Sequence, residues 1–503
     1  MAMDPIPKGD LPLGWPLIVT IFLLGITSVV TYRRFFHPLR DVPGPALASI
    51  SRIWHIYHIL KGDQNLQLVE LHEKHGHFIR LAHNEVSVSH PDGIKRILLA
   101  PLPKAPWYKM TAIPDYRFQT PMSTTDPKRK IERSRNFAAG YAMSNVLRSE
   151  PAIDGVISGF LAHLDGAAKS HSPMDLGQFF SFTAFDIIGE ILFSSQFGFL
   201  ASGRDLGNAI ANTRALAAYA SAMGFCRWVH VALFGNPFMT WLNILPYGHL
   251  FDTTVRALDK RLRDARDDSR FDIIEHWFRA MEKHPDRLNL RDVYAMATGV
   301  VGAASDTVSC ALQAFVYFML RTPGAWERAR REIDEAQKTH GTCKDKVVAF
   351  ADAQKLPYLQ ACLKEGLRVF GPVPMTLPRV APAEGVTIGE RHFPEGTILS
   401  INPWVMHLSK EIWGPDAREF NPDRWLREDA ASFDKWFMPW GQGYNSCPGQ
   451  HISRIEMSKI AATLVRDYDI SQVNPGQDWE WEAYFSLVPH SWPCYIKVRR
   501  EIS

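Results

Sequence analysis

The chain has 503 residues, of which 46% are hydrophobic, 12% aromatic and 22% charged. This length and composition supply enough apolar side chains for a large buried core, which excludes fibrous and intrinsically disordered proteins. The 56 lysines and arginines nearly balance the 53 aspartates and glutamates, for a formal net charge of +3. The chain therefore lacks the excess of positive charge that is typical of proteins that bind nucleic acid.

The first predicted element is a helix that crosses a membrane. Residues 11–32 contain no Asp, Glu, Lys or Arg, and a helix of that length extends about 33 Å, enough to span a bilayer. Charged residues on both sides of the span argue against a cleaved signal peptide. We therefore expect residues 1–32 to form a luminal tail and a transmembrane anchor, with a buried core helix as the alternative. Because Arg33, Arg34 and Arg40 follow the span, the positive-inside rule places the rest of the chain in the cytosol.

A stiff spacer and one large domain are predicted after the anchor. Residues 33–45 contain Pro38, Pro43 and Pro45, which fix backbone angles and remove amide donors, so we expect a proline-rich hinge. Residues 46–503 show no repeat, low-complexity stretch or flexible linker. They are therefore expected to form a single domain, which is large for one unit.

Helical patterns dominate this domain. Apolar residues recur every three or four positions in four segments, which predicts helices at residues 179–193, 293–320, 356–369 and 452–465. Alternating or β-branched residues beside turns predict strands at residues 78–81, 85–89, 386–388 and 397–400. The expected fold class is mainly α with small β-sheets (α+β). An aromatic stretch at residues 225–247 either enters a membrane near a substrate entrance or packs into the core.

The chemistry of the chain is predicted to centre on one cysteine. Cys447 lies in a glycine-rich loop that leads into the last predicted helix, and none of the six cysteines forms a CxxC pair. Free amides and the dipole at a helix N-terminus favour a thiolate, which is a strong ligand for haem iron. Gly441, Gly443 and Gly449 would let the backbone approach a flat cofactor. The alternative is an inert buried cysteine.

This loop resembles the haem-binding loop of the cytochrome P450 family, the haem-thiolate monooxygenases, which reads Phe-x-x-Gly-x-Arg-x-Cys-x-Gly. Gly443, Cys447 and Gly449 match the pattern. Trp440 stands where the family has Phe and keeps an aromatic wall, whereas Asn445 stands where the family has Arg and removes its charge. The resemblance implies that Cys447 is the axial ligand of the haem iron and that Trp440, Gly443 and Gly449 contact the cofactor.

A second motif concerns structure rather than chemistry. Glu365 and Arg368 match the family's Glu-x-x-Arg, and Arg424 lies in a segment similar to the family's downstream arginine motif. A pair three residues apart on a surface helix would be common and worth little. The resemblance implies instead that the three side chains form a buried network that holds the cysteine loop.

A third motif lies in the long helical stretch. Residues 303–307 resemble the family's Ala/Gly-Gly-x-Asp/Glu-Thr motif, with Asp306 and Thr307 at its end. The resemblance implies that these two residues deliver the protons that oxygen activation requires. The alternative for Thr307 is a hydroxyl bonded to its own backbone four residues earlier.

Haem carboxylates need cations or other donors. The resemblance implies Arg379 as one of them. The family has Trp or His followed by Arg in a helix that corresponds to the basic residues 128–135, but Lys130 and Ser134 stand at those positions. We therefore expect Arg133 or Arg135 to substitute. The same basic stretch suits an acidic redox partner, with a merely solvated face as the alternative.

The resemblance covers the chain from the anchor to its C-terminal part and implies a cytochrome P450 fold with a single-pass anchor in the endoplasmic reticulum membrane and a catalytic domain at residues 46–503 facing the cytosol. Details resemble filamentous-fungal members, including those similar to pisatin demethylase. The implied cofactors are haem b, O2 and NADPH, with electrons supplied by a reductase.

The implied reaction inserts one oxygen atom into a C–H or double bond of a lipophilic small molecule, as in secondary-metabolite biosynthesis or detoxification. Its apolar pocket is expected to include Ala303, Thr307, Val373, Pro374 and Leu487. Two alternatives are a haem-thiolate isomerase or dehydratase that works without a reductase, and a non-catalytic membrane-anchored haem-binding protein. The retained Asp-Thr pair favours the monooxygenase.

Overall fold

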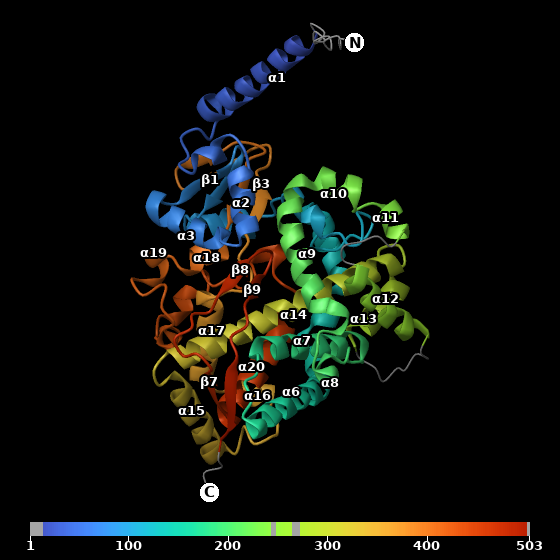
Figure 1. Ribbon diagram of the computed structural model, residues 1–503, viewed down its shortest axis with the longest axis vertical. Coiled ribbons are helices and arrows are strands. Elements are labelled where there is room, and N and C mark those ends of the chain that lie inside the picture. The colour runs from blue at the N-terminus through green and yellow to red at the C-terminus, as the bar shows by residue number, and fades with distance from the viewer. Residues whose placement is uncertain (1–13, 243–247, 264–271, 500–503) are drawn as a thin grey trace, which may run out of the picture.

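The computed structural model describes residues 14–242, 248–263 and 272–499, and it confirms a mainly helical molecule with small sheets (Figure 1). The helices are α1 (Gly14–Thr31), α2 (Ile53–Lys61), α3 (Gln64–His75), α4 (Pro127–Phe137), α5 (Met143–Arg148), α6 (Glu150–Ser170), α7 (Leu176–Phe193), α8 (Phe199–Ser202), α9 (Ala209–Met223), α10 (Arg227–Leu233), α11 (Pro237–Trp241), α12 (Gly248–Arg263), α13 (Ile273–Lys283), α14 (Leu290–Arg321), α15 (Ala325–His340), α16 (Phe350–Ala353), α17 (Pro357–Val369), α18 (Pro403–His407), α19 (Lys410–Trp413) and α20 (Gln450–Asp467). The strands are β1 (Phe78–Ala82), β2 (Glu85–Val88), β3 (Leu377–Val380), β4 (Val386–Ile388), β5 (Arg391–Phe393), β6 (Ile398–Ile401), β7 (Tyr468–Gln472), β8 (Trp481–Ala483), β9 (Leu487–Pro489) and β10 (Cys494–Val498).

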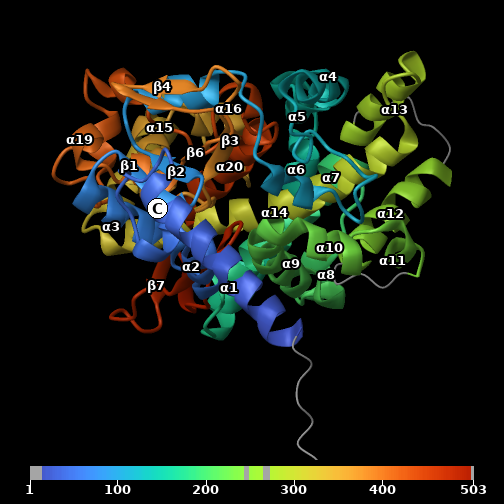
Figure 2. The same cartoon turned by 90° about the horizontal axis from the view of Figure 1, so that it is seen from above.

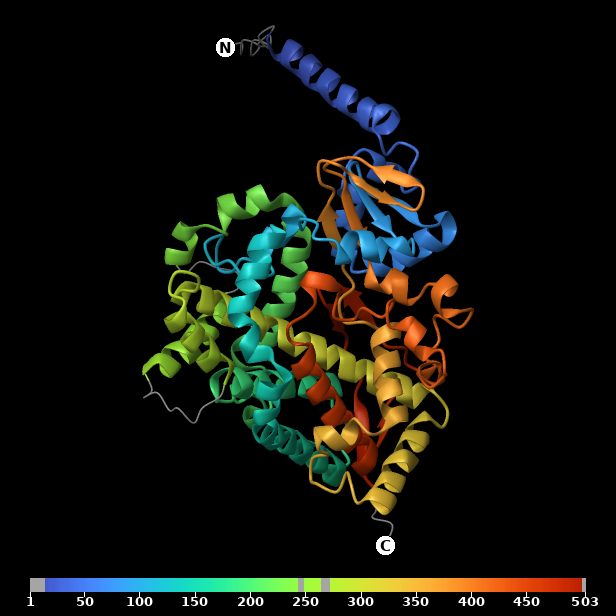
Figure 3. The ribbon, with the colours of Figure 1, turned by 180° about the vertical axis from the view of Figure 1, so that it is seen from behind.

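The largest sheet lies at the end of the molecule that carries the anchor (Figures 1 and 3). Its strand order is β1-β2-β6-β3, in which β2 pairs with β6 in parallel and the other two pairs are antiparallel. The remaining strands form three two-stranded sheets, β4–β5, β7–β10 and β8–β9. The four predicted strands correspond to β1, β2, β4 and β6, with ends that differ by at most one residue.

The longest helix, α14, runs through the middle of the helical part (Figures 2 and 3). A capping box fixes its start: the Asn289 side chain accepts from the Asp292 amide, and the Asp292 carboxylate accepts from the Asn289 amide, both at 3.2 Å. The helix that carries Thr307 therefore has a defined first turn.

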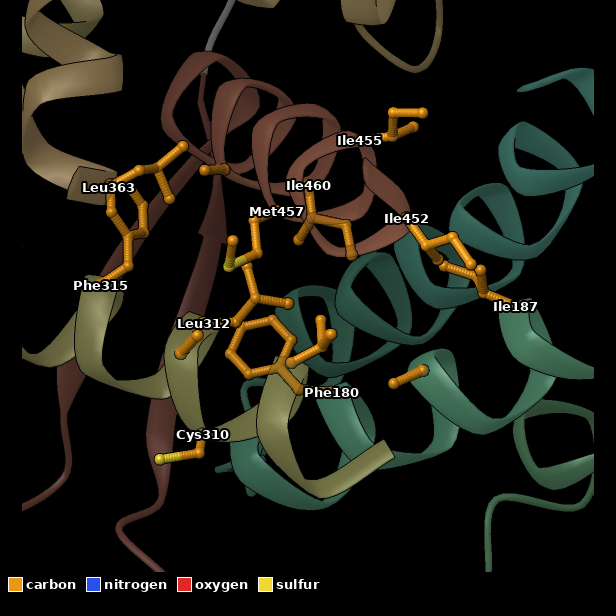
Figure 4. Close-up of a cluster of buried hydrophobic side chains, with 14 of the residues drawn as sticks. Phe180, Ile187, Cys310, Leu312, Phe315, Leu363, Ile452, Ile455, Met457 and Ile460 are labelled. Atoms are coloured by element: carbon orange, nitrogen blue, oxygen red, sulfur yellow. The ribbon is translucent and has the colours of Figure 1, made fainter. Parts of the chain in front are cut away.

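Apolar side chains from α7, α14, α17 and α20 meet in one buried cluster (Figure 4). The labelled members are Phe180, Ile187, Cys310, Leu312, Phe315, Leu363, Ile452, Ile455, Met457 and Ile460. Burying a side chain of the size of Leu or Phe is worth roughly 1.5–3 kcal/mol. Because α20 follows the cysteine loop, this packing fixes the loop relative to α14.

The predicted anchor stands apart from the rest of the molecule (Figure 1). Trp15–Phe36 is 22 residues long, has a mean hydropathy of 1.8 and is 0% buried, so it is a candidate membrane span. α7 and α14 are also long and apolar enough, but 83% and 67% of their spans are buried, which makes them core helices. The anchor continues as a π-helix, η1 (Tyr32–Phe36), into the segment predicted as a hinge. Residues 1–13 of the predicted tail and anchor lie outside the described residues.

The aromatic stretch at residues 225–247 exposes its largest side chains. Trp228 and Trp241 are each 77% exposed and Phe238 is 61% exposed. Phe225, by contrast, packs against the buried Trp107, so the start of the stretch belongs to the core and its later part is exposed. Residues 243–247 lie outside the described residues.

Candidate functional site

The cysteine loop is a closed turn tied to α20. The amide of Cys447 donates to the carbonyl of Trp440 at 2.8 Å, and the amide of Gly441 donates to the carbonyl of Met438 at 3.0 Å. The indole of Trp440 donates to the Ser453 hydroxyl on α20 at 3.0 Å. These bonds hold Cys447 just before the first turn of α20.

The thiol of Cys447 faces a space inside the molecule. Its side chain is accessible to water, yet the thiol lies deep enough for burial to raise its pKa. The amide of Gly449 lowers that pKa, but burial outweighs it. In the chain without a metal ion the pKa of the Cys447 thiol thus lies above its ordinary value, and a bound metal ion would add the positive charge that stabilises the ionised form.

Gly443 has a packing role that the loop pattern does not reveal. Its φ is +67°, and a Cβ at this position would lie 2.5 Å from the carbonyl oxygen of Leu98. The absence of a side chain thus lets the loop contact the backbone of η3 (Ile94–Leu99), a segment from much earlier in the chain. Contact with a cofactor is not needed to explain this glycine.

Ala303 and Thr307 mark an accessible face on the central helix. Ala303 is exposed and Thr307 is partly exposed, although most of α14 is buried, so this face borders an internal space. The Thr307 hydroxyl donates to the Ala303 carbonyl at 2.9 Å, which is the alternative that we gave for this threonine. Its oxygen can still accept a hydrogen bond.

Asp306 is a buried carboxyl group without a hydrogen-bond partner. It is 7% exposed, and neither carboxylate oxygen has a partner among the described residues. Burial raises the pKa of Asp306 to about 6, while the charge of Arg214 lowers it and that of Asp205 raises it. The group therefore titrates close to neutral pH, although no direct hydrogen bond joins it to Thr307.

Three buried cations gather near the cysteine loop. Lys104, Lys130 and Arg379 are 3%, 9% and 1% exposed. The ammonium of Lys130 donates to the carbonyl of Tyr444, three residues before the cysteine. Arg379 donates to the Tyr108 hydroxyl at 3.2 Å. Each of the three cations lacks an ion-pair partner within the part of the chain that the structure describes.

Burying the charges of Arg379 and Lys130 without a counter-charge costs free energy, and a bound anion would remove that cost. Burial and the charges of Arg379 and Lys130 lower the pKa of Lys104 to about 6. Donors without partners also occur at Nε of Arg379, Nη1 of Arg133 and Nδ2 of Asn445. The cluster therefore fits the carboxylates of a haem held at the cysteine loop.

Part of this cluster could be predicted from the sequence. Arg379 and Arg133 were expected to serve as carboxylate donors, and the structure leaves a nitrogen of each without a partner. Arg135 is exposed on α4, so it is not suited to the role that we predicted. Lys130 was named only as a departure from the family pattern, and Lys104 was missed, because no spacing or motif marks it as buried.

The buried cluster predicts that haem affinity falls as the pH rises. Without a bound anion, the pKa of Lys104 is about 6 and that of Lys130 is about 8. A nearby carboxylate stabilises the charged amines and raises both pKa values, so binding takes up protons. Above about pH 6 we expect affinity to fall by up to about tenfold per pH unit for each neutral lysine. Haem transfer to an acceptor protein at several pH values measures the slope.

A matched pair of variants isolates Lys104 in this measurement. Lys104→Met should weaken haem binding at low pH and flatten the slope. Lys128→Met, at an exposed position of α4, should change neither. A wild-type affinity that does not depend on pH would contradict the carboxylate assignment.

Glu365, Arg368 and Arg424 form a buried network. The Glu365 carboxylate accepts from Arg368 at 2.7 and 2.9 Å and from Arg424 at 3.4 Å. It also accepts from the Trp425 indole at 2.8 Å and the Asn421 amide at 3.0 Å. Glu365 and Arg368 have fully buried side chains.

The network reaches the cysteine loop through His407. Arg368 donates to the backbone carbonyl of His407 at 2.6 Å. Burial lowers the pKa of His407 to about 3, so the ring is neutral, and its Nε2 accepts from the Met438 amide at 2.9 Å. Met438 in turn accepts from Gly441 in the loop, which gives the network a path for positioning Cys447.

Only part of the predicted pocket lining presents a surface. Ala303 is exposed and Val373 is partly buried, whereas Pro374 and Leu487 are buried. The Leu487 amide donates to the Pro372 carbonyl at 2.9 Å, which places β9 against the segment before β3. Pro374 and Leu487 are therefore not accessible to a ligand, contrary to our prediction.

Comparisons with known proteins identify relatives across nearly the whole chain. The family model described as "Cytochrome P450" matches residues 43–494. The chain is 31% identical over 484 residues to cytochrome P450 monooxygenase hepC of Aspergillus oryzae, covering 92% of this chain and 93% of that protein. It is 29% identical over 499 residues to a pisatin demethylase of Fusarium vanettenii, covering 97% and 95%. A crystal structure of a cytochrome P450 (CYP102L1) shares the fold, with a TM-score of 0.74 at 20% identity over 91% of this chain and 99% of that chain.

Proposed function

Since the chain belongs to the cytochrome P450 family and is a haem-thiolate monooxygenase, we propose that it binds haem b through Cys447 and oxidises a lipophilic small molecule with O2 and electrons from NADPH. The proposed reaction is a hydroxylation, an epoxidation or a related oxidation. Fungal cytochrome P450 monooxygenases among the relatives support a substrate from secondary metabolism or detoxification.

The observation that carries the proposal is the buried cluster of Lys104, Lys130 and Arg379 beside the cysteine loop. A haem-thiolate site needs an anionic sulfur ligand for the iron and cations for the haem carboxylates. Cys447 offers a thiol to an internal space, and the cluster offers cations without counter-anions. Bound haem supplies the chemistry that activates oxygen and transfers one oxygen atom.

The residues of the chain have distinct roles in this proposal. Cys447 holds the iron, and Lys104, Lys130 and Arg379 hold the carboxylates. Ala303 lacks a bulky side chain and leaves room beside α14. Asp306 and Thr307 hold and move protons at their carboxyl and hydroxyl oxygens. Trp440 forms an aromatic wall.

The test of the proposal combines the substrate and both co-substrates. Metabolites that accumulate in a strain without this protein supply candidate substrates. We expect the purified full-length protein with a reductase to consume NADPH and O2 only when such a substrate is present, and to place one atom of labelled oxygen in the product. Turnover that persists without NADPH and O2 would contradict the proposal and identify an isomerase or dehydratase.

Thr307→Ala is expected to uncouple electron use from product formation. Without the hydroxyl, proton delivery is impaired, so reducing equivalents should yield peroxide and product per NADPH should fall by about tenfold or more. Haem binding should be unchanged. The control is Thr298→Ala, which removes a similar bond, from the Thr298 hydroxyl to the Tyr294 carbonyl at 2.9 Å. Equal coupling in both variants and the wild type would rule out a catalytic Thr307.

An acidic reductase is proposed to dock on α4. Lys128, Arg129 and Arg135 are exposed on this helix, and Lys130 on the same helix contacts the cysteine loop. Complementary charges steer the encounter of redox partners. This surface would therefore offer electrons a route to the side of the site that carries the cysteine loop.

The proposed location is the endoplasmic reticulum membrane, with the catalytic domain in the cytosol. Arginines directly after α1 support this orientation. Helices α2, α10 and α11 lie toward the end of the molecule that carries the anchor (Figure 1). All three expose apolar side chains, which in α2 are those of Ile53, Tyr57 and Leu60. We propose that these helices touch the membrane and admit a lipophilic substrate from it.

Tryptophan quenching tests this membrane contact. In bilayers of brominated lipid, Trp228 and Trp241 should be quenched because both are 77% exposed and their helices, α10 and α11, lie toward the end of the molecule that carries the anchor (Figure 1). Replacing both by Phe should remove a measurable part of the quenching. Replacing the buried Trp277 by Phe should not. An unchanged quenched fraction in the double variant would place these helices in water.

A further inference from the structure

A second group of unpaired cations lies where the anchor meets the catalytic domain. A cavity of about 500 Å³ opens there. Its lining residues are Ser28, Val29, Tyr32, Arg33, His37 and His83. One wall thus comes from the last turns of the membrane anchor, and the other comes from the hinge and the turn between β1 and β2.

Arginine side chains connect these walls. Arg33 donates to the Ile50 carbonyl at 2.8 Å. Arg80, which is 1% exposed, donates to the carbonyls of Arg33 at 3.1 Å and His83 at 2.7 Å. Its Nε and Nη1 are buried without a hydrogen-bond partner. Arg80 therefore links the backbones of Arg33 and His83, and two of its nitrogens remain without an acceptor.

The charges at this junction are not balanced. Among the described residues, no carboxylate pairs with Arg33, Arg34 or Arg80. Burial, followed by the charges of Arg34 and Arg33, lowers the pKa of Arg80, while the charge of Asp41, which pairs with Arg391, raises it. Grouped arginines without a counter-anion repel one another, and a bound anion would remove that cost.

The histidines can contribute neutral donors. The Leu39 amide donates to Nδ1 of His37 at 3.1 Å, so the proton of the neutral ring sits on Nε2, which is free to donate. Burial and neighbouring arginines lower the pKa of both His37 and His83. The cavity thus combines one lining guanidinium with imidazole N–H groups, a set that suits phosphate oxygens.

The position of the cavity selects the source of the phosphate. It lies at the end of the membrane span, where lipid headgroups are found, and Val29 and Tyr32 add apolar surface from α1 itself. A free phosphate would use only the polar wall. A phospholipid would use both walls, with its phosphate at the arginine and its glycerol and first methylenes along the anchor.

We propose that this cavity binds the headgroup phosphate of an anionic phospholipid from the leaflet around the end of α1. Arg33, His37 and His83 contact the phosphate. Arg80 positions Arg33 and His83 through hydrogen bonds to their carbonyls. The lipid thereby joins the anchor to the domain and fixes the angle between them. The inference rests on α1 being a membrane anchor and is independent of the proposed reaction.

The experiment uses the full-length protein in nanodiscs that contain phosphatidylcholine and phosphatidic acid, with native mass spectrometry of the lipids that stay bound. We expect phosphatidic acid to be retained about tenfold above its share of the bilayer. This enrichment corresponds to the affinity that roughly one charge-assisted hydrogen bond adds. Arg33→Gln and His83→Leu should each remove this enrichment. Arg40→Gln should keep it, because Arg40 is exposed in the hinge and does not line the cavity.

Several results would overturn the proposal. Equal retention of the two lipids would do so, as would an equal loss in Arg40→Gln and Arg33→Gln, which would indicate diffuse charge. Calorimetry with inorganic phosphate distinguishes the source of the phosphate. We expect heat of binding in pure phosphatidylcholine nanodiscs and none in nanodiscs that also contain phosphatidic acid. Heat of binding that persists with phosphatidic acid present would assign the site to free phosphate. The carbon monoxide spectrum of each variant reports separately on the haem site. If the proposed function failed in that spectrum, the lipid-binding test would still be valid.

Discussion

Glu365→Ala is expected to lose about 3 to 5 kcal/mol of unfolding free energy and to yield little folded, haem-loaded protein. The carboxylate accepts five hydrogen bonds, and its removal leaves the buried guanidinium of Arg368 without a counter-charge. The same change loosens the path through His407 to the cysteine loop. Denaturant unfolding and the haem content of purified protein measure the two effects.

An exposed pair with the same spacing supplies the control. Lys355 and Asp352 lie three residues apart at 3.4 Å, and the lysine side chain is 67% exposed. Lys355→Ala should therefore cost less than about 1 kcal/mol. Recovery of stable, haem-replete Glu365→Ala would show that the network does not hold the loop.

Cys447→Ala is expected to abolish the haem-thiolate spectrum. The protein should still fold, because the thiol faces an internal space and is not part of the packed core. Reduced protein treated with carbon monoxide should show no red-shifted Soret band. Cys226→Ala, at a half-buried position in the short helix η7 (Gly224–Cys226), should retain the band. A normal spectrum from Cys447→Ala would assign the iron to another ligand.

The scaffold could be predicted because its main helices carry apolar residues at helical spacing. α7, α14, α17 and α20 all occur where that pattern predicts them. Glu365 and Arg424 are distant in sequence, so spacing alone does not bring them together. Their contact followed from resemblance to a known family, and the structure contains it.

Other features depend on packing that no local pattern reveals. The burial of Lys104 arises from segments that close over it, including the carbonyls of Pro121 and Met122 that accept from its ammonium. The need for glycine at position 443 arises from the backbone of Leu98. Leu487 is buried because β9 contacts the segment before β3. Each of these depends on residues far apart in the chain.

The choice between Arg133 and Arg135 is also a matter of geometry. Arg133 lies three residues after the buried Lys130 and so shares its side of α4, whereas Arg135 lies five residues after it. Helical periodicity would have separated the two once one buried position on the helix was known. The sequence alone did not indicate that Lys130 was that position.

The most direct measurement of the central claim is the absorbance of the reduced full-length protein with carbon monoxide. If sulfur at position 447 donates to the haem iron, the Soret band shifts to the long wavelength typical of a thiolate ligand. A band at the shorter wavelength of nitrogen-ligated haem, or colourless protein after haem supplementation, would contradict it.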